Sequence, residues 1–261
     1  MTSAVSTNIV ITGASNGLGR ALALEYAAPG IVLGLIGRDD ERLEGVAREC
    51  RARGASTRVG RVDVRDATAM ADWLCAFDDF APIDLLISNA GVASTLASAS
   101  DWEGLERTAT IVNTNFFGVV HCVLPVIERM RMRRSGQIAM ISSLAAFRGM
   151  AISPAYCASK SAVRAYADSV RPLLVREGIA VSLVFPGFVR TAMSDVFPGD
   201  KPLMWSAERA ARYIRRKVDR RRAEIAFPMA LAVGMRLLSI LPARVADAIL
   251  DGLSYLPRKG A

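Results

Sequence analysis

Tyr156 and Lys160 stand four positions apart in the stretch SPAYCASKSAV, residues 153–163. In a helix, positions i and i+4 share one face, so the two side chains would lie close together. A phenol titrates near ~10 in model peptides, and lowering its pKa to ~7 requires about 4 kcal/mol. One positive charge ~4 Å away contributes about that much at an effective dielectric of ~20. The pair therefore predicts a tyrosine that a lysine tunes for general acid/base catalysis.

A glycine-rich loop follows the first apolar run of the chain. It reads TGASNGLG, residues 12–19, and the helix-like stretch RALALEYAA comes next. The G-x-x-x-G-x-G spacing is neither G-x-G-x-x-G nor a P-loop, which would end in lysine. Glycines before a helix still let the backbone approach a pyrophosphate at the helix N-terminus. The candidate cofactor-binding residues of this loop are Gly13, Ser15, Asn16, Gly17, Leu18 and Gly19.

The second loop indicates which dinucleotide is bound. Binding of NAD usually requires an acidic side chain at the end of the second strand, whereas an arginine there accommodates the extra phosphate of NADP. The sequence LIGRDDER has Gly37 where that acid would stand, and Arg38 follows it. Arg42, one helical turn later, could add a second charge-assisted contact. These residues favour NADP (NADPH) over NAD; in the alternative, Arg38 pairs with Asp39 or Asp40 and contacts no phosphate.

Seven short apolar runs recur along the chain, with helix-like stretches between them. They are NIVIT (8–12), IVLGLIG (31–37), TRVGRVDV (57–64), DLLISNAG (84–91), GQIAMISS (136–143), IAVSLVFPG (179–187) and AEIAFP (223–228). Strands that alternate with helices predict βαβ units, and near-continuous apolar runs favour strands buried on both faces. We therefore expect an α/β fold of the doubly wound, Rossmann type, with about seven parallel strands and helices on both faces. The seven runs and the glycine loop disfavour a (β/α)₈ barrel, the competing architecture.

Composition limits the other possibilities. Hydrophobic residues make up 52% and charged residues 22%, so the chain can bury a substantial core. No Pro/Gly/Ser-rich linker divides it, and we expect one domain over 1–261. Its cofactor and catalytic core would cover about 1–191, and a substrate lid with C-terminal helices about 192–261.

Charge and cysteine content exclude several classes of function. The net charge is +8, and arginines gather at 128–134 and 215–222. Both groups fall at predicted helix ends, where cations oppose the macrodipole, so we expect solvated helix ends and no nucleic-acid partner. The four cysteines form no C-x-x-C pair and His121 is the only histidine, which disfavours a metal site and a Ser-His-Asp triad. With scattered thiols and no secretory signal pattern, we expect a cytoplasmic protein.

Six motifs occur in an order and spacing that resemble the short-chain dehydrogenase/reductase family in its single-domain form. They are TGASNGLG (12–19), SNAG (88–91), NTNFFG (113–118), ISS (141–143), YCASK (156–160) and PGFVRT (186–191). The resemblance implies that Tyr156 is the catalytic acid/base and Lys160 its partner and a ribose ligand. It also implies that Ser143 polarises the carbonyl and that Asn115 anchors a water of a proton relay. Ser143 is preferred to Ser142 because it stands thirteen residues before Tyr156.

The resemblance also implies further cofactor contacts and an oligomer. Asp63 and Val64 would contact the adenine, and the segment with Pro186, Gly187, Val189 and Thr191 would hold the nicotinamide carboxamide. The family's NNAG is SNAG here, which keeps Asn89, Ala90 and Gly91 in place. Family members commonly pair through the helices that here contain Asn115 and Tyr156, so we expect a homodimer or homotetramer.

We expect the substrate-binding side of the cleft to include Ser94, Thr95, the loop after Ser143 and the stretch 188–205. These segments offer Phe147, Met150, Ile152, Met193, Phe197, Met204 and Trp205. They suit an apolar ketone or alcohol, unless they only pack the lid shut.

The apolar segment 226–250 is interrupted by Arg236 and by prolines at 228 and 242. It has too few consecutive uncharged residues for a transmembrane helix of about 20 residues. An amphipathic helix could cover the substrate cleft, pack on another subunit or make peripheral membrane contact. We expect burial on the cleft or on a subunit.

Two functions of different classes compete. The first is an NADP(H)-dependent oxidoreductase that interconverts a ketone and a secondary alcohol, with tyrosine as the acid/base and no metal. The alternative is a non-catalytic nucleotide-bound sensor or membrane-associated scaffold with the same fold. The intact set of Asn115, Ser143, Tyr156 and Lys160 favours the enzyme, because a sensor does not need it.

Overall fold

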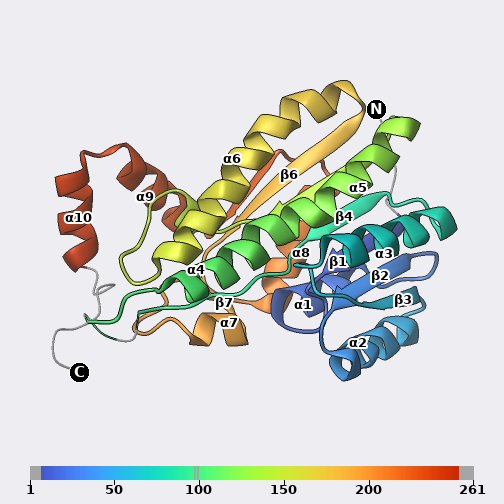
Figure 1. Cartoon of the computed structure of the whole chain (residues 1–261), viewed down its shortest axis with the longest axis horizontal. Coiled ribbons are helices and arrows are strands. Elements are labelled where there is room, and N and C mark those ends of the chain that lie inside the picture. Colours follow the sequence, from blue (N-terminus) through green and yellow to red (C-terminus); the bar gives the residue numbers. More distant parts are fainter. Residues whose placement is uncertain (1–6, 97, 99, 253–261) are drawn as a thin grey trace.

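The computed structural model describes residues 7–96, 98 and 100–252. Its centre is a parallel sheet with seven strands among these residues, in the order β3-β2-β1-β4-β5-β6-β9 (Figure 1). The strands are β1 (Asn8–Thr12), β2 (Val32–Gly37), β3 (Ser56–Arg61), β4 (Leu85–Ser88), β5 (Gly136–Ile141), β6 (Ile179–Pro186) and β9 (Glu224–Phe227). Each strand lies within, or within one residue of, one of the predicted apolar runs. The predicted doubly wound α/β fold is confirmed.

Helices cover both faces of the sheet (Figure 1). On one face, α3 (Ala67–Phe80), α5 (Gly118–Arg133) and α6 (Pro154–Arg176) share a core cluster with Val10 of β1. On the other, α1 (Gly17–Tyr26), α2 (Asp40–Ala52) and α8 (Ala207–Val218) share a cluster with Ile9 and Ile11. Successive residues of β1 thus point to opposite cores, as the pleat of a strand requires. This two-sided burial explains why several of the predicted runs are nearly all apolar, whereas the run of the edge strand β3 carries exposed arginines.

The strand order places a binding crevice at the end of β1. The chain builds outwards from β1 to β3, then returns to the other side of β1 to form β4 and the strands beyond it. In open α/β sheets, ligands bind outside the carboxyl ends of the strands at such a reversal. Thr12 joins the two halves here, because its hydroxyl accepts the N–H groups of Asn89 and Ala90 at 3.0 Å each.

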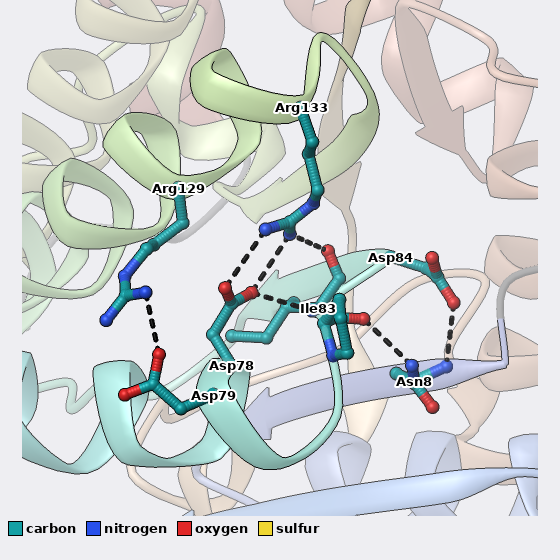
Figure 2. A network of polar contacts seen from close by, with 8 residues as sticks. Asn8, Asp78, Asp79, Ile83, Asp84, Arg129 and Arg133 are labelled. Carbon is teal, nitrogen blue, oxygen red and sulfur yellow. Dashed lines mark hydrogen bonds and ion pairs between the residues drawn. The ribbon is translucent and has the colours of Figure 1, made fainter.

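A polar network fixes the turn between α3 and β4 (Figure 2). The buried carboxylate of Asp78 accepts the Ile83 N–H at 2.8 Å and pairs with Arg133 at 3.0 Å. Arg133 also donates to the Ile83 carbonyl at 2.7 Å, and Arg129 pairs with Asp79 at 2.7 Å. Two arginines of α5 therefore hold the end of α3 and the chain entering β4.

The arginine groups lie at helix ends, as predicted. Within the run 128–134, Arg131 and Arg134 both pair with Glu177 at the end of α6, at 3.2 and 3.5 Å. The second run surrounds the end of α8 at Val218. Cations at these C-terminal ends interact favourably with the helix dipole, and most arginines of the first run also form ion pairs within the chain.

The apolar segment 226–250 contains two helices, where the sequence suggested one. These are α9 (Met229–Ile240) and α10 (Ala243–Gly252). Leu241 lies between them in an extended conformation, with φ −74° and ψ 150°, because the following Pro242 disfavours helical backbone before it. Arg236 of α9 pairs with Glu224, and Asp247 of α10 pairs with Arg148 at 2.5 Å. Residues 253–261 of the predicted tail lie outside the described residues.

One continuous helix is long and apolar enough to cross a membrane by length and composition alone. It covers residues 105–133 and consists of α4 (Leu105–Val112), a π-helical turn (Asn113–Phe117) and α5. Ile111, Val119 and Val123 on its inner side are buried. Core packing therefore accounts for its apolar character.

Candidate active site

The glycine loop between β1 and α1 forms one wall of the crevice. Gly13 and Gly17 have φ values of +67° and +53°, which favour glycine. A Cβ on Gly13 would lie 2.8 Å from the Cα of Ala90, so a larger residue would displace the neighbouring loop. Asn16 caps α1 by accepting the Gly17 N–H at 2.6 Å. The backbone here can approach a phosphate at a helix N-terminus.

Gly19 does not line the cavity, which differs from the predicted cofactor contact. A Cβ at this position would lie 2.1 Å from the carbonyl oxygen of Gly13 and 2.6 Å from the amide nitrogen of Asn89. Only glycine lets the first turn of α1 pack this closely behind the loop. Gly19 supports the loop from inside the protein.

The other predicted cofactor residues line one continuous cavity of about 770 Å³. They are Gly13, Ser15, Asn16, Gly17, Leu18, Arg38, Asp63, Val64, Asn89, Ala90, Gly91, Tyr156, Lys160, Pro186, Gly187, Val189 and Thr191. These residues come from five segments at the carboxyl ends of the strands and from the first turns of α6 (Pro154–Arg176). This lining fits a nicotinamide dinucleotide. The backbone at the N-terminus of α1 can approach the pyrophosphate, charged side chains lie at one end of the cavity, and Tyr156 lies at the other.

Arg38 is exposed at the end of β2. The following Asp39 caps α2, accepts the Arg42 N–H at 3.0 Å and pairs with the Arg42 side chain at 3.2 Å. Among the described residues, Arg38 makes no ion pair with Asp39 or Asp40. The alternative in which these aspartates neutralise Arg38 is therefore not seen. Arg42, expected as a second phosphate contact, is engaged by Asp39.

Asp63 and Val64, which the resemblance expects to contact the adenine, line the cavity after β3. Hydrogen bonds from Arg65, whose guanidinium lies 2.6 Å away, hold the pKa of the Asp63 carboxyl below its usual value. Val64 is buried, and its carbonyl oxygen lies 2.9 Å from Nδ1 of His121. The single histidine of the sequence thus contacts backbone in this structure.

Ser143 and Tyr156 meet at the other end of the cavity. Ser143 stands two residues after β5 and caps the short 3₁₀ turn Leu144–Ala146, where its hydroxyl accepts the Ala145 N–H at 3.1 Å. Burial raises the pKa of Tyr156 to about 12, although the nearby Ser143 hydroxyl acts in the opposite direction. Ser142 instead donates to the Lys160 carbonyl at 2.8 Å within the core. The geometry thus agrees with the choice of Ser143 over Ser142.

Lys160 is buried next to Tyr156. Contrary to the prediction from the sequence, it does not lower the pKa of the Tyr156 phenol. Its Nζ donates to the Ile141 carbonyl at 3.0 Å and lies 5.9 Å from the centroid of the Tyr156 ring. Burial lowers the pKa of Lys160 itself to about 8. The i, i+4 spacing places both residues on one helix face, but the amine bonds to the end of β5.

Asn115 lies behind the cavity wall, in the π-helical turn between α4 and α5. Its side-chain oxygen accepts the Val92 N–H at 2.8 Å, and its amide donates to the Val92 carbonyl at 2.9 Å and to Ser159 at 3.0 Å. Ser159 in turn donates to the Tyr156 carbonyl at 2.7 Å. Asn115 therefore joins the loop after β4 to the catalytic helix α6.

Only part of the predicted substrate side reaches the cavity. Met150, Met193 and Phe197 line it, and Phe197 packs edge-on against the Tyr156 ring. Phe147, Ile152, Met204 and Trp205 do not line it. Phe147 packs against Phe185 in the core, and Trp205 stacks on Phe227. These aromatic side chains therefore contribute to the packing between strands and helices.

Ser94 and Thr95, expected on the substrate side, form hydrogen bonds within the protein. Ser94 donates to Glu103 at 2.6 Å, and Thr95 donates to the Val196 carbonyl at 3.1 Å. The second carboxylate oxygen of Glu103 accepts the Ala155 N–H at 2.6 Å, one residue before Tyr156. Sequence reasoning missed Glu103, because an isolated acid in a loop gives no sign that it caps a helix fifty residues later.

The inner face of α9 is the second feature that the sequence did not reveal in detail. Ala230, Leu231, Gly234, Met235 and Leu238 line the cavity beyond Phe197 and Met150. The expectation that the C-terminal apolar segment covers the cleft agrees with this placement. Within the described residues, no cluster of three or more His, Cys, Asp or Glu could hold a metal ion.

Comparisons with known proteins agree with this geometry. The model of the short chain dehydrogenase family matches residues 7–201. An uncharacterized oxidoreductase of Myxococcus xanthus is 34% identical over 241 residues, covering 92% of this chain and 94% of its own. A short-chain dehydrogenase/reductase of Burkholderia phymatum, solved with NAD, is similar with a TM-score of 0.82 and 25% identity over 96% of this chain and 97% of its own.

A short-chain dehydrogenase of Sphingobium yanoikuyae, solved with NADPH, shares the fold with a TM-score of 0.78. Its identity is 24%, over 97% of each chain. The solved relatives thus include one with each nicotinamide dinucleotide. The family match, the Myxococcus relative and the arrangement of Ser143, Tyr156 and Lys160 lead to one conclusion: the chain belongs to the short-chain dehydrogenase family of oxidoreductases that act on CH–OH groups with a nicotinamide cofactor.

Proposed function

We propose that the protein is an NADP(H)-dependent oxidoreductase that interconverts a ketone and a secondary alcohol. The observation that carries this proposal is that Ser143 and Tyr156 both line the cavity, close enough for the Ser143 hydroxyl to lower the pKa of the phenol. Two hydroxyls that converge on one point can bind one carbonyl oxygen.

The chain's own residues position the substrate and move the proton. The Ser143 hydroxyl donates to the substrate oxygen and polarises the carbonyl. Tyr156, whose pKa burial raises to about 12, keeps its proton at neutral pH and is ready to give it to the developing alkoxide. A nicotinamide dinucleotide bound along residues 13–18 and 186–191 would supply the hydride.

Lys160 has two proposed roles, which are to act as the partner of Tyr156 and to bind the ribose of the cofactor. Its bond to the Ile141 carbonyl fixes the amine beside Tyr156, within the cavity wall. A ribose hydroxyl at that wall would give the buried amine a further partner. An additional hydrogen-bond acceptor stabilises the ammonium form and so opposes the effect of burial.

The proposed preference for NADP rests on Arg38. Arg38 is exposed at the rim, and Asp39 is occupied by Arg42. A guanidinium bond to a phosphate is worth about 1.5–3 kcal/mol, or about 10- to 100-fold in affinity. Arg38→Ala should weaken NADPH binding by this factor and change NADH binding by less than about threefold. Arg48→Ala, an exposed arginine on α2 away from the cavity, is the control, and equal losses for NADPH and NADH in Arg38→Ala would refute the phosphate role.

The direct test of the reaction is NADPH oxidation by the purified protein with a panel of uncharged ketones. We expect oxidation that depends on the added carbonyl compound, and the reverse reaction with NADP⁺ and the corresponding secondary alcohols. Tight NADPH binding without carbonyl-dependent oxidation across the panel would indicate the sensor instead.

We also propose that the protein is a homodimer or homotetramer and is located in the cytoplasm. The helices that contain Asn115 and Tyr156 expose Phe117, Leu124, Leu173 and Val175, which supports pairing through these helices. All four cysteines are free, which supports a reducing compartment such as the cytoplasm.

A further inference from the structure

The wall of the cavity beyond Tyr156 differs in chemistry from the cofactor end. Its charged lining residues are Arg38, Asp39, Arg42 and Asp63 at the adenine end, and Lys160 beside Tyr156. All described lining residues of the remote part are uncharged. A charged substrate group placed there would lose its hydration without gaining a partner.

The remote wall is also apolar. Its lining includes Val92, Met150, Met193 and Phe197, together with residues of α9. The α9 residues that line the cavity stand at 230, 231, 234, 235 and 238, which is one face of a helix. Burying each methylene of a ligand between such walls is worth about 0.8 kcal/mol, or about fourfold in affinity.

Gly234 interrupts this apolar face of α9. A glycine inside a helix costs roughly 0.5–1 kcal/mol relative to alanine. The backbone of Gly234 does not need glycine, because its φ is not positive, and a Cβ there would meet nothing within 4 Å. By contrast, a Cβ on Gly13 would meet the protein at 2.8 Å. Gly234 lines the cavity and is exposed, so the open space beside it lies at the solvent-accessible part of the cavity.

We infer that the substrate is an uncharged carbonyl compound whose extended apolar group lies along α9, and that Gly234 determines how large a group is accepted. This inference rests on the proposed function, because it names the substrate class of the same site. The carbonyl binds at Ser143 and Tyr156, and the apolar group extends past Phe197 and Met150 towards Gly234.

The test uses methyl ketones of increasing alkyl length, with ω-carboxylated ketones of matched length as charged competitors. For the wild-type protein with NADPH, kcat/KM should rise by about fourfold per added methylene until the cavity is filled. The charged ketones should lose at least about tenfold against their uncharged counterparts. A flat dependence on chain length, or a preference for the carboxylated ketones, would overturn the inference and leave the proposed function intact.

Variants at α9 locate the effect. Gly234→Leu should lower the ratio of kcat/KM for long over short ketones by at least about tenfold, and Gly234→Ala should lower it by a smaller factor while favouring the helix. Val233→Leu adds bulk to the exposed neighbouring position and is the matched control. Unchanged ratios in both Gly234 variants would contradict the role of Gly234. If the wild-type protein reduced no carbonyl compound at all, the proposed function itself would be refuted, and this inference with it.

Discussion

At the scale of single residues, burial dominates the electrostatics of the site. Tyr156 and Lys160 are both buried, and burial favours the neutral form of each side chain. It raises the pKa of Tyr156 to about 12 and lowers the pKa of Lys160 to about 8. At neutral pH the phenol therefore carries its proton, as a general acid for ketone reduction must. Burial of the Lys160 ammonium lowers the free energy of unfolding, and this loss of stability can be measured.

The cost of burying Lys160 should appear as a pH dependence of stability. Its pKa is lowered in the folded state, so the unfolded chain binds more protons between about pH 8 and 10.5. The contribution of Lys160 to the stability of the cofactor-free protein should therefore rise with pH across this window, by up to about 3 kcal/mol. The buried thiols of Cys50, Cys122 and Cys157 act in the opposite direction above about pH 9, because burial raises their pKa values.

The measurement is therefore the difference in denaturant unfolding between wild type and Lys160→Met at a series of pH values. The variant should be more stable than wild type at pH 7, and the difference should shrink between about pH 8 and 10.5; parallel curves would contradict the burial cost.

At the scale of elements, α6 depends on a cap from a distant loop. Its own N-cap residue, Ser153, makes no side-chain capping bond and instead donates to the Ser94 carbonyl at 2.8 Å. Glu103 supplies the missing acceptor at Ala155 and also accepts from Ser94. A carboxylate at a helix N-terminus stabilises the helix, and here it also ties the substrate-side loop to the helix of Tyr156.

Replacing Glu103 should therefore affect substrate binding more than cofactor binding. Glu103→Ala should lower kcat/KM for ketones by about fivefold to tenfold, mainly through KM, since a lost cap is worth about 1 kcal/mol. NADPH affinity should change by less than about twofold. Glu103→Gln keeps an acceptor oxygen and should restore part of the activity, and Glu106→Ala removes an exposed acid of α4 as the control. Equal changes in ketone KM and NADPH affinity would show a general loss of structure.

At the scale of the whole molecule, the polar network under β4 should contribute to stability independently of catalysis. Asp78 is 6% exposed, whereas the neighbouring Asp79 is 62% exposed. Asp78→Ala leaves the Arg133 guanidinium and the Ile83 N–H without their acceptor, at a cost of about 2–4 kcal/mol. Asp79→Ala, the control, should cost less than about 1 kcal/mol. Denaturant unfolding measures both; similar losses for the two variants would contradict the role of burial.

The overall architecture could be predicted from the sequence because local patterns determine it. Short apolar or alternating runs indicate the seven strands, most of them buried on both faces, and the glycine loop indicates the position of the crevice. Thirteen-residue spacing distinguished Ser143 from Ser142. Contacts between distant segments could not be predicted in this way. The bond of Lys160 to Ile141, the Glu103 cap, the break before Pro242 and the core position of Phe147 all depend on three-dimensional packing.

The most direct test of the central claim compares the removal of two buried phenol hydroxyls. Tyr156→Phe removes the one at the cavity wall, and Tyr26→Phe removes one in α1, away from the cavity. NADPH-dependent ketone reduction should fall by at least about 100-fold in Tyr156→Phe and stay within about threefold in Tyr26→Phe. NADPH affinity should stay within about threefold in both variants. Ketone reduction by Tyr156→Phe at the rate of Tyr26→Phe would contradict the account.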